Sequence, residues 1–384
     1  MVKAGTNHTL QSIDMTRHLF LLLLALALFA APSQAQNVDR TISVKSGGLL
    51  TMNIETGGDI EIRGWDRSEV HVLAEIDGRD SERIDFQVSE TSRGVAIRSE
   101  YRSRRGRSSS NVQVVVRVPR EYDLDVETMG GDLTVVDVSG RLEGSSMGGD
   151  LVLSGLAGIV QMSTMGGDVT LSDSEVDGKV STMGGDVDLR NVTGTVNGST
   201  MGGDVSYNNV RSPRTEKGET VTVETMGGDI EIDEALFGAN VKTMGGDIEI
   251  NKAAVFVRAE TMGGDITVRE IDGWIELETM GGDIEAHMTG GTSGDRHVDM
   301  ESKGGDITLT VPRGLAMTFD IEVILDDDDE YRIESDFDLN INVDEKDSRW
   351  RGGGRVHATG STGNGANRIR IKTYDGKVVI RERR

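Results

Sequence analysis

Residues 181–190 read STMGGDVDLR and contain the word Thr-Met-Gly-Gly-Asp, which the chain spells in full eight times. With near-identical versions included, the Asp of the word falls at 132, 150, 168, 186, 204, 229, 247, 265, 283 and 306. Successive positions differ by 18, except for two longer gaps of 25 and 23, and a related stretch, ETGGDIEI, stands earlier at 55–62. A fixed period of this size indicates a stacked repeat protein with two insertions.

The residues between two words follow the periodicity of strands. In the unit that begins at Asp265, the apolar positions are Ile266, Val268, Ile271, Ile275 and Leu277. Spacing by two within DITV and WIEL is typical of strands, and Gly-Gly marks a corner that needs positive φ or close backbone approach. We therefore predict an all-β fold, a right-handed parallel β-helix (β-solenoid) with about 18 residues per coil. A left-handed hexapeptide coil fits poorly, because the apolar residues do not recur every six positions.

Each letter of the word then has an expected role. The Asp is expected to accept hydrogen bonds from the turn amides of the Gly-Gly corner. A ladder of Ca²⁺ sites is possible but not favoured, because the Ca²⁺-binding nonapeptide pattern G-G-x-G-x-D is absent. Thr is expected to point inward and Met outward, in a row from Met129 through Met280. We interpret this row as packing over the Gly-Gly corner, with a sticky edge for a partner as the alternative.

The N-terminal segment predicts export. Residues 17–36 read RHLFLLLLALALFAAPSQAQ, with a basic residue, an apolar run of about 13 residues and small residues at a cleavage site. Such a run is short for a membrane span, so residues 1–35 are predicted to be a signal peptide and the mature chain to lack a transmembrane span. The expected location is the periplasm or the cell surface and extracellular space.

The remaining chain divides into three parts around the repeats. Residues 36–124 are expected to be an N-terminal β-strand region, 125–310 the β-helix and 311–384 a C-terminal β region that caps it. Two polar, Gly-rich insertions, at 208–219 and 288–297, should bulge from corners and are candidates for specificity. The acidic run DDDDE at 326–330 is expected to be a solvated turn or an edge guard.

No catalytic, cofactor or metal site is expected. The hydrolase pattern G-x-S-x-G occurs around Ser146, but this Ser occupies the Thr position of the word and has no His partner in a strand-to-helix turn. His71, His287, His297 and His357 are scattered without metal-ligand spacing, and the chain has no Cys. A formal net charge of −24 repels nucleic acid, so no nucleic-acid partner is expected.

The order of segments resembles the bacterial "putative adhesin" family of β-strand repeat proteins, a domain of unknown function. The resemblance is carried by GGDIEIRGWDRSEVHV at 57–72, VRVPREYDLDVETMGGDLTV at 116–135, the recurring GGDIEI and the closing RIRIKTYDGKVVI. It implies an exported β-solenoid and supplies no catalytic residues.

These observations predict a non-enzymatic, adhesin-like interaction scaffold of the cell envelope. Its partner, an unknown envelope protein or glycan, would dock along a flat strand face or against the inserted loops. One alternative is a structural β-helix that assembles end to end into a polymer. A less favoured alternative is a polysaccharide-acting β-helix enzyme, which needs acidic clusters beside Arg or Lys on one face.

Overall fold

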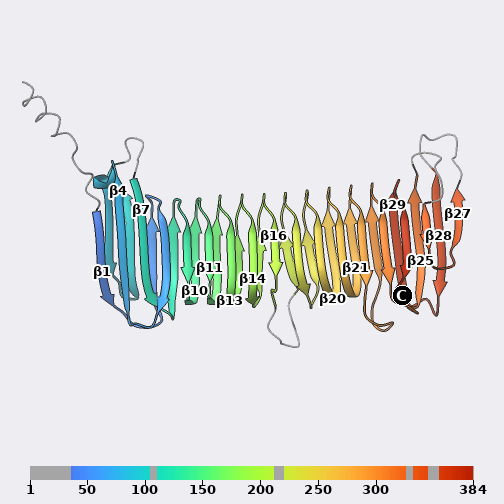
Figure 1. Cartoon of the computed structure of the whole chain (residues 1–384), viewed down its shortest axis with the longest axis horizontal. Coiled ribbons are helices and arrows are strands. Elements are labelled where there is room, and N and C mark those ends of the chain that lie inside the picture. The colour runs from blue at the N-terminus through green and yellow to red at the C-terminus, as the bar shows by residue number, and fades with distance from the viewer. Residues whose placement is uncertain (1–35, 104–109, 212–219, 326–331, 345–353, 384) are drawn as a thin grey trace, which may run out of the picture.

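The computed structural model describes residues 36–103, 110–211, 220–325, 332–344 and 354–383. The predicted signal peptide at 1–35, most of the insertion at 208–219 and the acidic run at 326–330 lie outside the described residues. Figure 1 shows a long rod in which the strands lie across the length and the chain advances from one end to the other. The described helical content is a single 3-10 turn, Ser81–Arg83, so the all-β prediction is confirmed. No helix in the described ranges is both long enough and apolar enough to cross a bilayer.

The strands fall into three groups along the rod. The N-terminal group is β1 (Gln36–Ser43), β2 (Gly48–Ile54), β3 (Asp59–Trp65), β4 (Glu69–Gly78), β5 (Ile84–Glu90), β6 (Gly94–Tyr101) and β7 (Ser110–Pro119). The repeats form β8 (Tyr122–Thr128), β9 (Leu133–Val136), β10 (Ser139–Ser146), β11 (Leu151–Ser154), β12 (Ala157–Thr164), β13 (Val169–Ser181), β14 (Val187–Thr193), β15 (Val196–Ser199), β16 (Val205–Asn208), β17 (Val221–Glu224), β18 (Ile230–Ala235), β19 (Ala239–Lys242), β20 (Ile248–Thr261), β21 (Ile266–Thr279), β22 (Ile284–Met288), β23 (Val298–Ser302) and β24 (Ile307–Val311). The C-terminal group is β25 (Met317–Ile324), β26 (Ile333–Ser335), β27 (Asn340–Asp344), β28 (Arg355–Thr362), β29 (Asn367–Tyr374) and β30 (Val378–Glu382).

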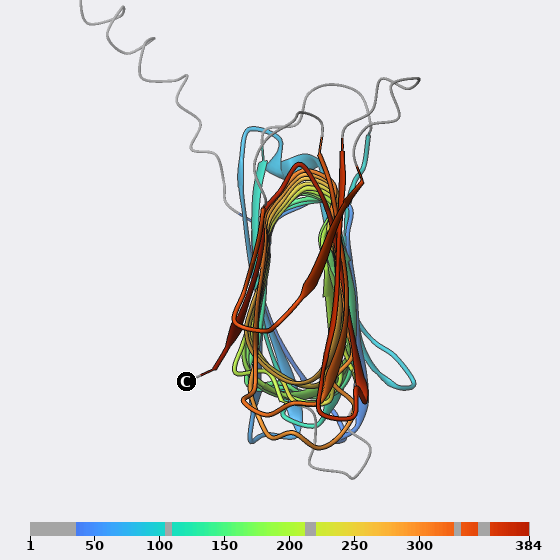
Figure 2. The same ribbon diagram turned by 90° about the vertical axis from the view of Figure 1, so that its right-hand side faces the viewer.

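Each repeat contributes to two opposite sheets. The residues that lead up to the word join one sheet, which we call face A, and the residues that follow the word join the other, face B. The long strands β13, β20 and β21 run through both faces. On face A, β8, β10 and β12 pair in parallel, and on face B β9, β11 and β13 do the same. Paired residues stand one repeat apart in the chain, as with Ser139 and Ala157 or Leu151 and Val169. Figure 2, along the rod, shows the two faces as the long sides of a flattened outline.

The core is one continuous apolar cluster between the two faces. At two inward positions occupied by glycine, a large side chain from a neighbouring strand fills the space that glycine leaves empty. A Cβ at Gly144 would meet the sulfur of Met162 at 2.6 Å, and one at Gly198 would meet the Tyr207 hydroxyl at 3.3 Å. Burial raises the pKa of Tyr207 to about 12, and its hydroxyl donates to the carbonyl of Val196 at 3.1 Å. The repeats thus vary in side-chain volume while their backbones keep one register.

Across the longer gaps, the residues just after the word keep this register, while β21 and β22 shift by one residue between Val268 and Ile271. Across the first gap, between Asp204 and Asp229, Val205 pairs with Ile230 on face B. Across the second gap, Ile284 pairs with Ile307 in the same way. The expectation that insertions bulge without breaking the stack is confirmed for the described residues.

The forerunner at 55–62 belongs to the same stack. β2 pairs with β8 and β3 pairs with β9, both in parallel, although β4 to β7 intervene in the chain. Antiparallel pairs then finish this end of the rod: β5 joins β6 on face A, and β1 joins β4 beyond β7 on face B.

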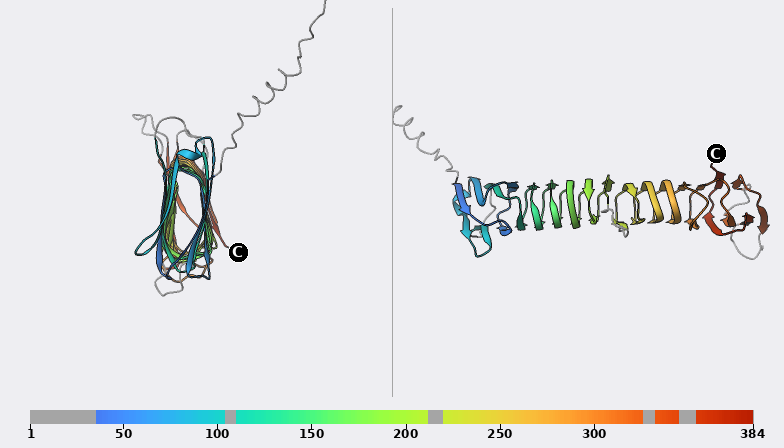
Figure 3. Two further views of the ribbon diagram at one scale, coloured as in Figure 1. Left: turned by 90° about the vertical axis from the view of Figure 1, so that its left-hand side faces the viewer. Right: turned by 90° about the horizontal axis from the view of Figure 1, so that it is seen from below.

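The C-terminal tail pairs directly with the last coil of the repeats. β29 lies between β23 and β25, in parallel with both, and β30 lies beside β24. The tail therefore covers the last coil by adding one more coil to the stack. At the C-terminal end of the rod, which Figure 3 shows from two further sides, the edge of face A is formed by β25, β28 and β27. β28 runs antiparallel to both of its neighbours. Strand order at this end depends on pairings between strands far apart in the chain, which local pattern does not encode.

Candidate functional site

The Asp residues of the word bind the coils to one another. The carboxylate of each Asp accepts a hydrogen bond from the backbone N–H of the Asp in the next coil, at 2.7 to 3.2 Å, from Asp59 onward. At the end of the row, Asp306 accepts from the N–H of Lys377 in the tail. The predicted acceptor role is confirmed, but the donor is the next coil's Asp amide and not the Gly-Gly amides. Because the backbone turns at this corner, the carboxylate takes the place of a backbone carbonyl as the hydrogen-bond acceptor between neighbouring coils.

This geometry allows the hydrogen-bonding role of the Asp carboxylate to be tested separately from its charge. We expect Asp186→Ala to lower the free energy of unfolding by about 1 kcal/mol, because the N–H of Asp204 loses its acceptor. Asp186→Asn keeps an acceptor oxygen and removes like-charge repulsion of about 1 kcal/mol per neighbour in water, so stability should be unchanged or higher. Urea unfolding of both variants makes the measurement. An Asn variant as unstable as the Ala variant, with melting that responds to Ca²⁺, would reverse this assignment.

The Thr residues of the word point inward, as predicted. Each is at most 5% exposed, and from Thr164 onward each hydroxyl donates to the second Gly carbonyl of the preceding coil at 2.7 to 3.0 Å. The same hydroxyl accepts from glycine amides of its own word in most coils, as between Gly246 and Thr243. Ser302 makes the same bond at 2.8 Å. The corner is therefore bonded from the inside by Thr and from the outside by Asp.

The Met residues of the word lie in solvent. All nine are 41% to 56% exposed: Met129, Met147, Met165, Met183, Met201, Met226, Met244, Met262 and Met280. About half of each Met side chain is therefore exposed, which is more than packing over the corner predicts. The exposed edge that was the alternative is what the structure contains.

The residues considered for catalysis do not come together. Ser146 is 2% exposed and donates a hydrogen bond to the carbonyl of Gly148, so it takes the structural role of the Thr in the repeated word. Each of the four histidines considered pairs with its own carboxylate: His71 with Asp39, His287 with Glu285, His297 with Asp295 and His357 with Asp320. Among the described residues, no three or more Cys, His, Asp or Glu side chains are placed to hold a metal ion.

A stacked aromatic pair lies on the outer surface of face A. Phe256 of β20 and Trp274 of β21 face each other across neighbouring coils, with ring centroids 5.0 Å apart and planes inclined by 14°. The Arg258 guanidinium lies 6.0 Å from the Trp274 ring. The sequence analysis missed this pair, although both residues stand nine positions after the Asp of their word. Alignment of the units at that position would have found it.

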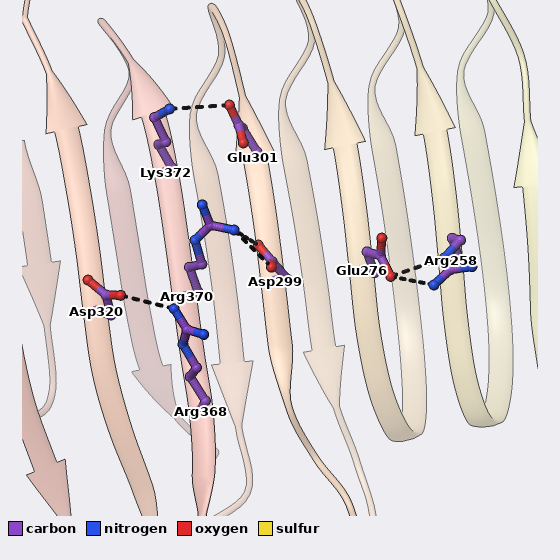
Figure 4. Close-up of polar contacts among 8 residues, drawn as sticks. All are labelled: Arg258, Glu276, Asp299, Glu301, Asp320, Arg368, Arg370 and Lys372. Atoms are coloured by element: carbon purple, nitrogen blue, oxygen red, sulfur yellow. Dashed lines mark hydrogen bonds and ion pairs between the residues drawn. The ribbon is translucent and has the colours of Figure 1, made fainter.

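Charged residues continue this surface toward the C-terminal end (Figure 4). Arg258 binds Glu276 through two nitrogens, at 2.7 and 3.0 Å. Further along, Arg370 reaches Asp299 at 3.2 Å and Arg368 reaches Asp320 at 3.3 Å, and Lys372 lies 3.5 Å from Glu301. We call Phe256, Trp274 and these eight charged residues the outer patch. Sequence alone did not place Arg368, Arg370 and Lys372 here, because they come from the tail coil.

The outer patch is charged at neutral pH. Hydrogen bonding from His357, with a second contact from Arg368, lowers the pKa of Asp320 from its usual 3.8. The nearby Asp299 carboxylate raises the pKa of the Arg370 guanidinium. Three of the ion pairs in the outer patch are about half exposed, and Lys372–Glu301 is less so. The three more exposed pairs therefore add little stability, and their groups are available to an incoming ligand.

A separate cleft lies at the start of the Met row. It has a volume of about 590 Å³ and is lined by residues that include Tyr101, Met129 and Met147. The Tyr101 hydroxyl bonds Ser110 at 3.0 Å across its wall. This cleft is open and lacks the charged pairs and stacked rings of the outer patch.

A family model, Toastrack DUF4097, matches residues 50–257 and 180–320. No curated protein matches the chain. Three solved structures are similar at low identity. The first is a "putative cell adhesion protein" of Clostridium sporogenes, with 8% identity over 91% of this chain and 100% of that chain and a TM-score of 0.19. The second is a "putative adhesin" of Bacteroides fragilis, with 13% identity over 91% of this chain and 97% of that chain and a TM-score of 0.21. The third is a "putative lipid binding protein" of Parabacteroides distasonis, with 12% identity over 91% of this chain and 98% of that chain and a TM-score of 0.25.

Proposed function

Because the chain belongs to the Toastrack DUF4097 family, as the resemblance indicated, we propose that it is an adhesin-like scaffold whose outer patch binds a glycan. The observation that carries the proposal is the Phe256–Trp274 stack beside the Arg258–Glu276 pair on a flat sheet. Sugar rings present apolar C–H faces and a rim of hydroxyls. Aromatic rings suit the faces, while carboxylates accept from the hydroxyls and guanidinium groups donate to them.

The proposal includes export and a binding, non-enzymatic role. The signal-peptide pattern at 1–35 and the absence of Cys support a location in the periplasm or at the cell surface. The pairing of each described histidine with a single carboxylate supports binding without catalysis. The net charge of −24 opposes nucleic acid as a partner.

The architecture within the proposal is a right-handed solenoid of about 18 residues per coil. Strand partners that stand one word apart in the chain support the coil length, and the general preference for right-handed parallel crossovers supports the hand. The divisions at 36–124, 125–310 and 311–384 are kept, with the stack continuing into β2 and β3 at one end and β29 and β30 at the other. Assembly into a polymer is less well supported, because antiparallel strands occupy both ends.

We expect Trp274→Ala to reduce glycan binding at least tenfold, because one ring of the platform is lost. Ile159→Ala is the matched control, since Ile159 stands at the same position of an earlier coil and is exposed, whereas Trp274 is partly buried. Intact protein and both variants are compared on an array of bacterial envelope glycans, with circular dichroism to verify the fold. Equal binding by the Trp274 and Ile159 variants, or binding only to envelope proteins, would contradict the proposal.

A further inference from the structure

The Met residues of the word form an unbroken row of exposed thioethers along one edge of the rod. The backbone N–H of Met147 donates to Thr128 and that of Met165 to Ser146, both at 3.1 Å, so consecutive Met residues stand one coil apart. Parallel strands pair at about 4.8 Å, which sets the spacing of the row. The row ends at Lys303, whose N–H bonds the Thr279 carbonyl in the same register.

The residues at and around the row indicate a role for the Met thioether itself, and not only for an apolar side chain. Residues just before the Thr of the word vary from coil to coil, as with Glu127, Ser145 and Lys242, while the Met is kept in nine coils. Leu or Ile, which would serve an apolar edge equally well, do not appear at this position. Two glycines follow each Met, so no side chain of the word shields the sulfur.

The electrostatic setting favours a cation. The exposed Asp row runs parallel to the Met row, three residues further along each coil, and the whole chain carries a net charge of −24. Carboxylates prefer hard cations, whereas thioethers prefer soft ones such as Cu⁺. The Asp row therefore raises the local cation concentration, while the sulfur row discriminates among cations.

We propose that the Met row binds soft monovalent cations, Cu⁺ or Ag⁺, each held between the thioethers of two neighbouring coils. A zinc–thiolate bond is about 2.3 Å long, and two metal–sulfur bonds of about that length in line span about 4.6 Å, close to the spacing of the coils. The three rotatable bonds of Met allow the sulfurs to adjust. Cations in adjacent gaps would share a sulfur and repel by about 1 kcal/mol in water, so alternate gaps fill first and the nine Met residues take about four ions.

The test is calorimetric titration of the intact chain with Ag⁺. About four ions should bind per chain, and X-ray absorption of the Cu⁺-loaded protein should show sulfur neighbours. A variant with Leu at all nine row positions should bind at least a hundredfold more weakly. The matched control, Met52→Leu with Met300→Leu, changes two buried Met residues and should bind as the intact chain does.

Unchanged Ag⁺ binding in the nine-Leu variant would overturn the proposal, as would absence of binding by the intact chain or a metal shell of oxygen and nitrogen only. Circular dichroism of each variant shows that the fold is retained. If nine substitutions prevent folding, Leu at Met165, Met183, Met201 and Met226 alone should remove about half of the bound ions. The inference does not depend on the glycan proposal, because the outer patch contains no residue of the Met row.

Discussion

Gly185→Ala should destabilise the solenoid by about 3 kcal/mol or more, whereas Gly184→Ala should cost less than about 1 kcal/mol. A Cβ at Gly185 would lie 2.6 Å from the carbonyl carbon of Gly167 in the preceding coil and closer still to its oxygen. Neither glycine has positive φ, so the difference is steric and not conformational. A Cβ at Gly184 would meet nothing nearer than 3.6 Å.

The two glycines thus form a matched pair one residue apart in the same word. Urea and thermal unfolding followed by circular dichroism give the two costs. Because each coil contacts mainly its neighbours, the Gly185 defect should also broaden the transition by uncoupling the two halves of the stack. Equal destabilisation by both variants would mean that the coils do not approach at the second glycine.

Thr243→Val should cost about 1–3 kcal/mol, although it keeps the shape of the side chain. Thr243 is fully buried, donates to the Gly228 carbonyl at 2.9 Å and accepts from the Gly246 amide at 3.4 Å. Valine fills the same volume but leaves the carbonyl and the amide without this partner in a dry interior.

Thr243→Ser is the control, because the hydroxyl stays and Ser already occupies this position at Ser146 and Ser302. We expect the Ser variant to lose at most about 1 kcal/mol, for one methyl group. The comparison is made by urea unfolding. The slope of the unfolding free energy against urea concentration should be the same for all variants if they expose the same surface on unfolding. A Val variant as stable as the intact chain would show that the hydroxyl contributes nothing between coils.

Local pattern was sufficient to predict the strands, the corners and the inward Thr. Alternation of apolar residues every two positions fixes which side faces the core, and Thr243 and Thr279 lie at 0% exposure as that alternation requires. The need for glycine follows from the same stacking, since Gly185 faces the backbone of the coil before it.

Contacts between coils were less accessible to sequence reasoning. The spacing of Asp186 and Asp204 indicates that they are neighbours, but not that the amide of one bonds the carboxylate of the other. The exposure of the Met row was underestimated because exposure depends on what covers a corner, and here only glycines follow. The strand order of the tail was not predicted, because the pairing of β29 with both β23 and β25 is a long-range choice between similar strands.

The central claim is that each word marks one coil and that the words stack in a straight row. The chain has no Cys, so Met147→Cys and Met280→Cys can be spin-labelled without competing thiols. These exposed positions are seven words apart, and the first of the two longer gaps lies between them. Double electron–electron resonance should give a narrow distribution near the backbone separation of about 34 Å. A broad distribution, or a mean displaced by two coil spacings or more, would contradict the stacked account.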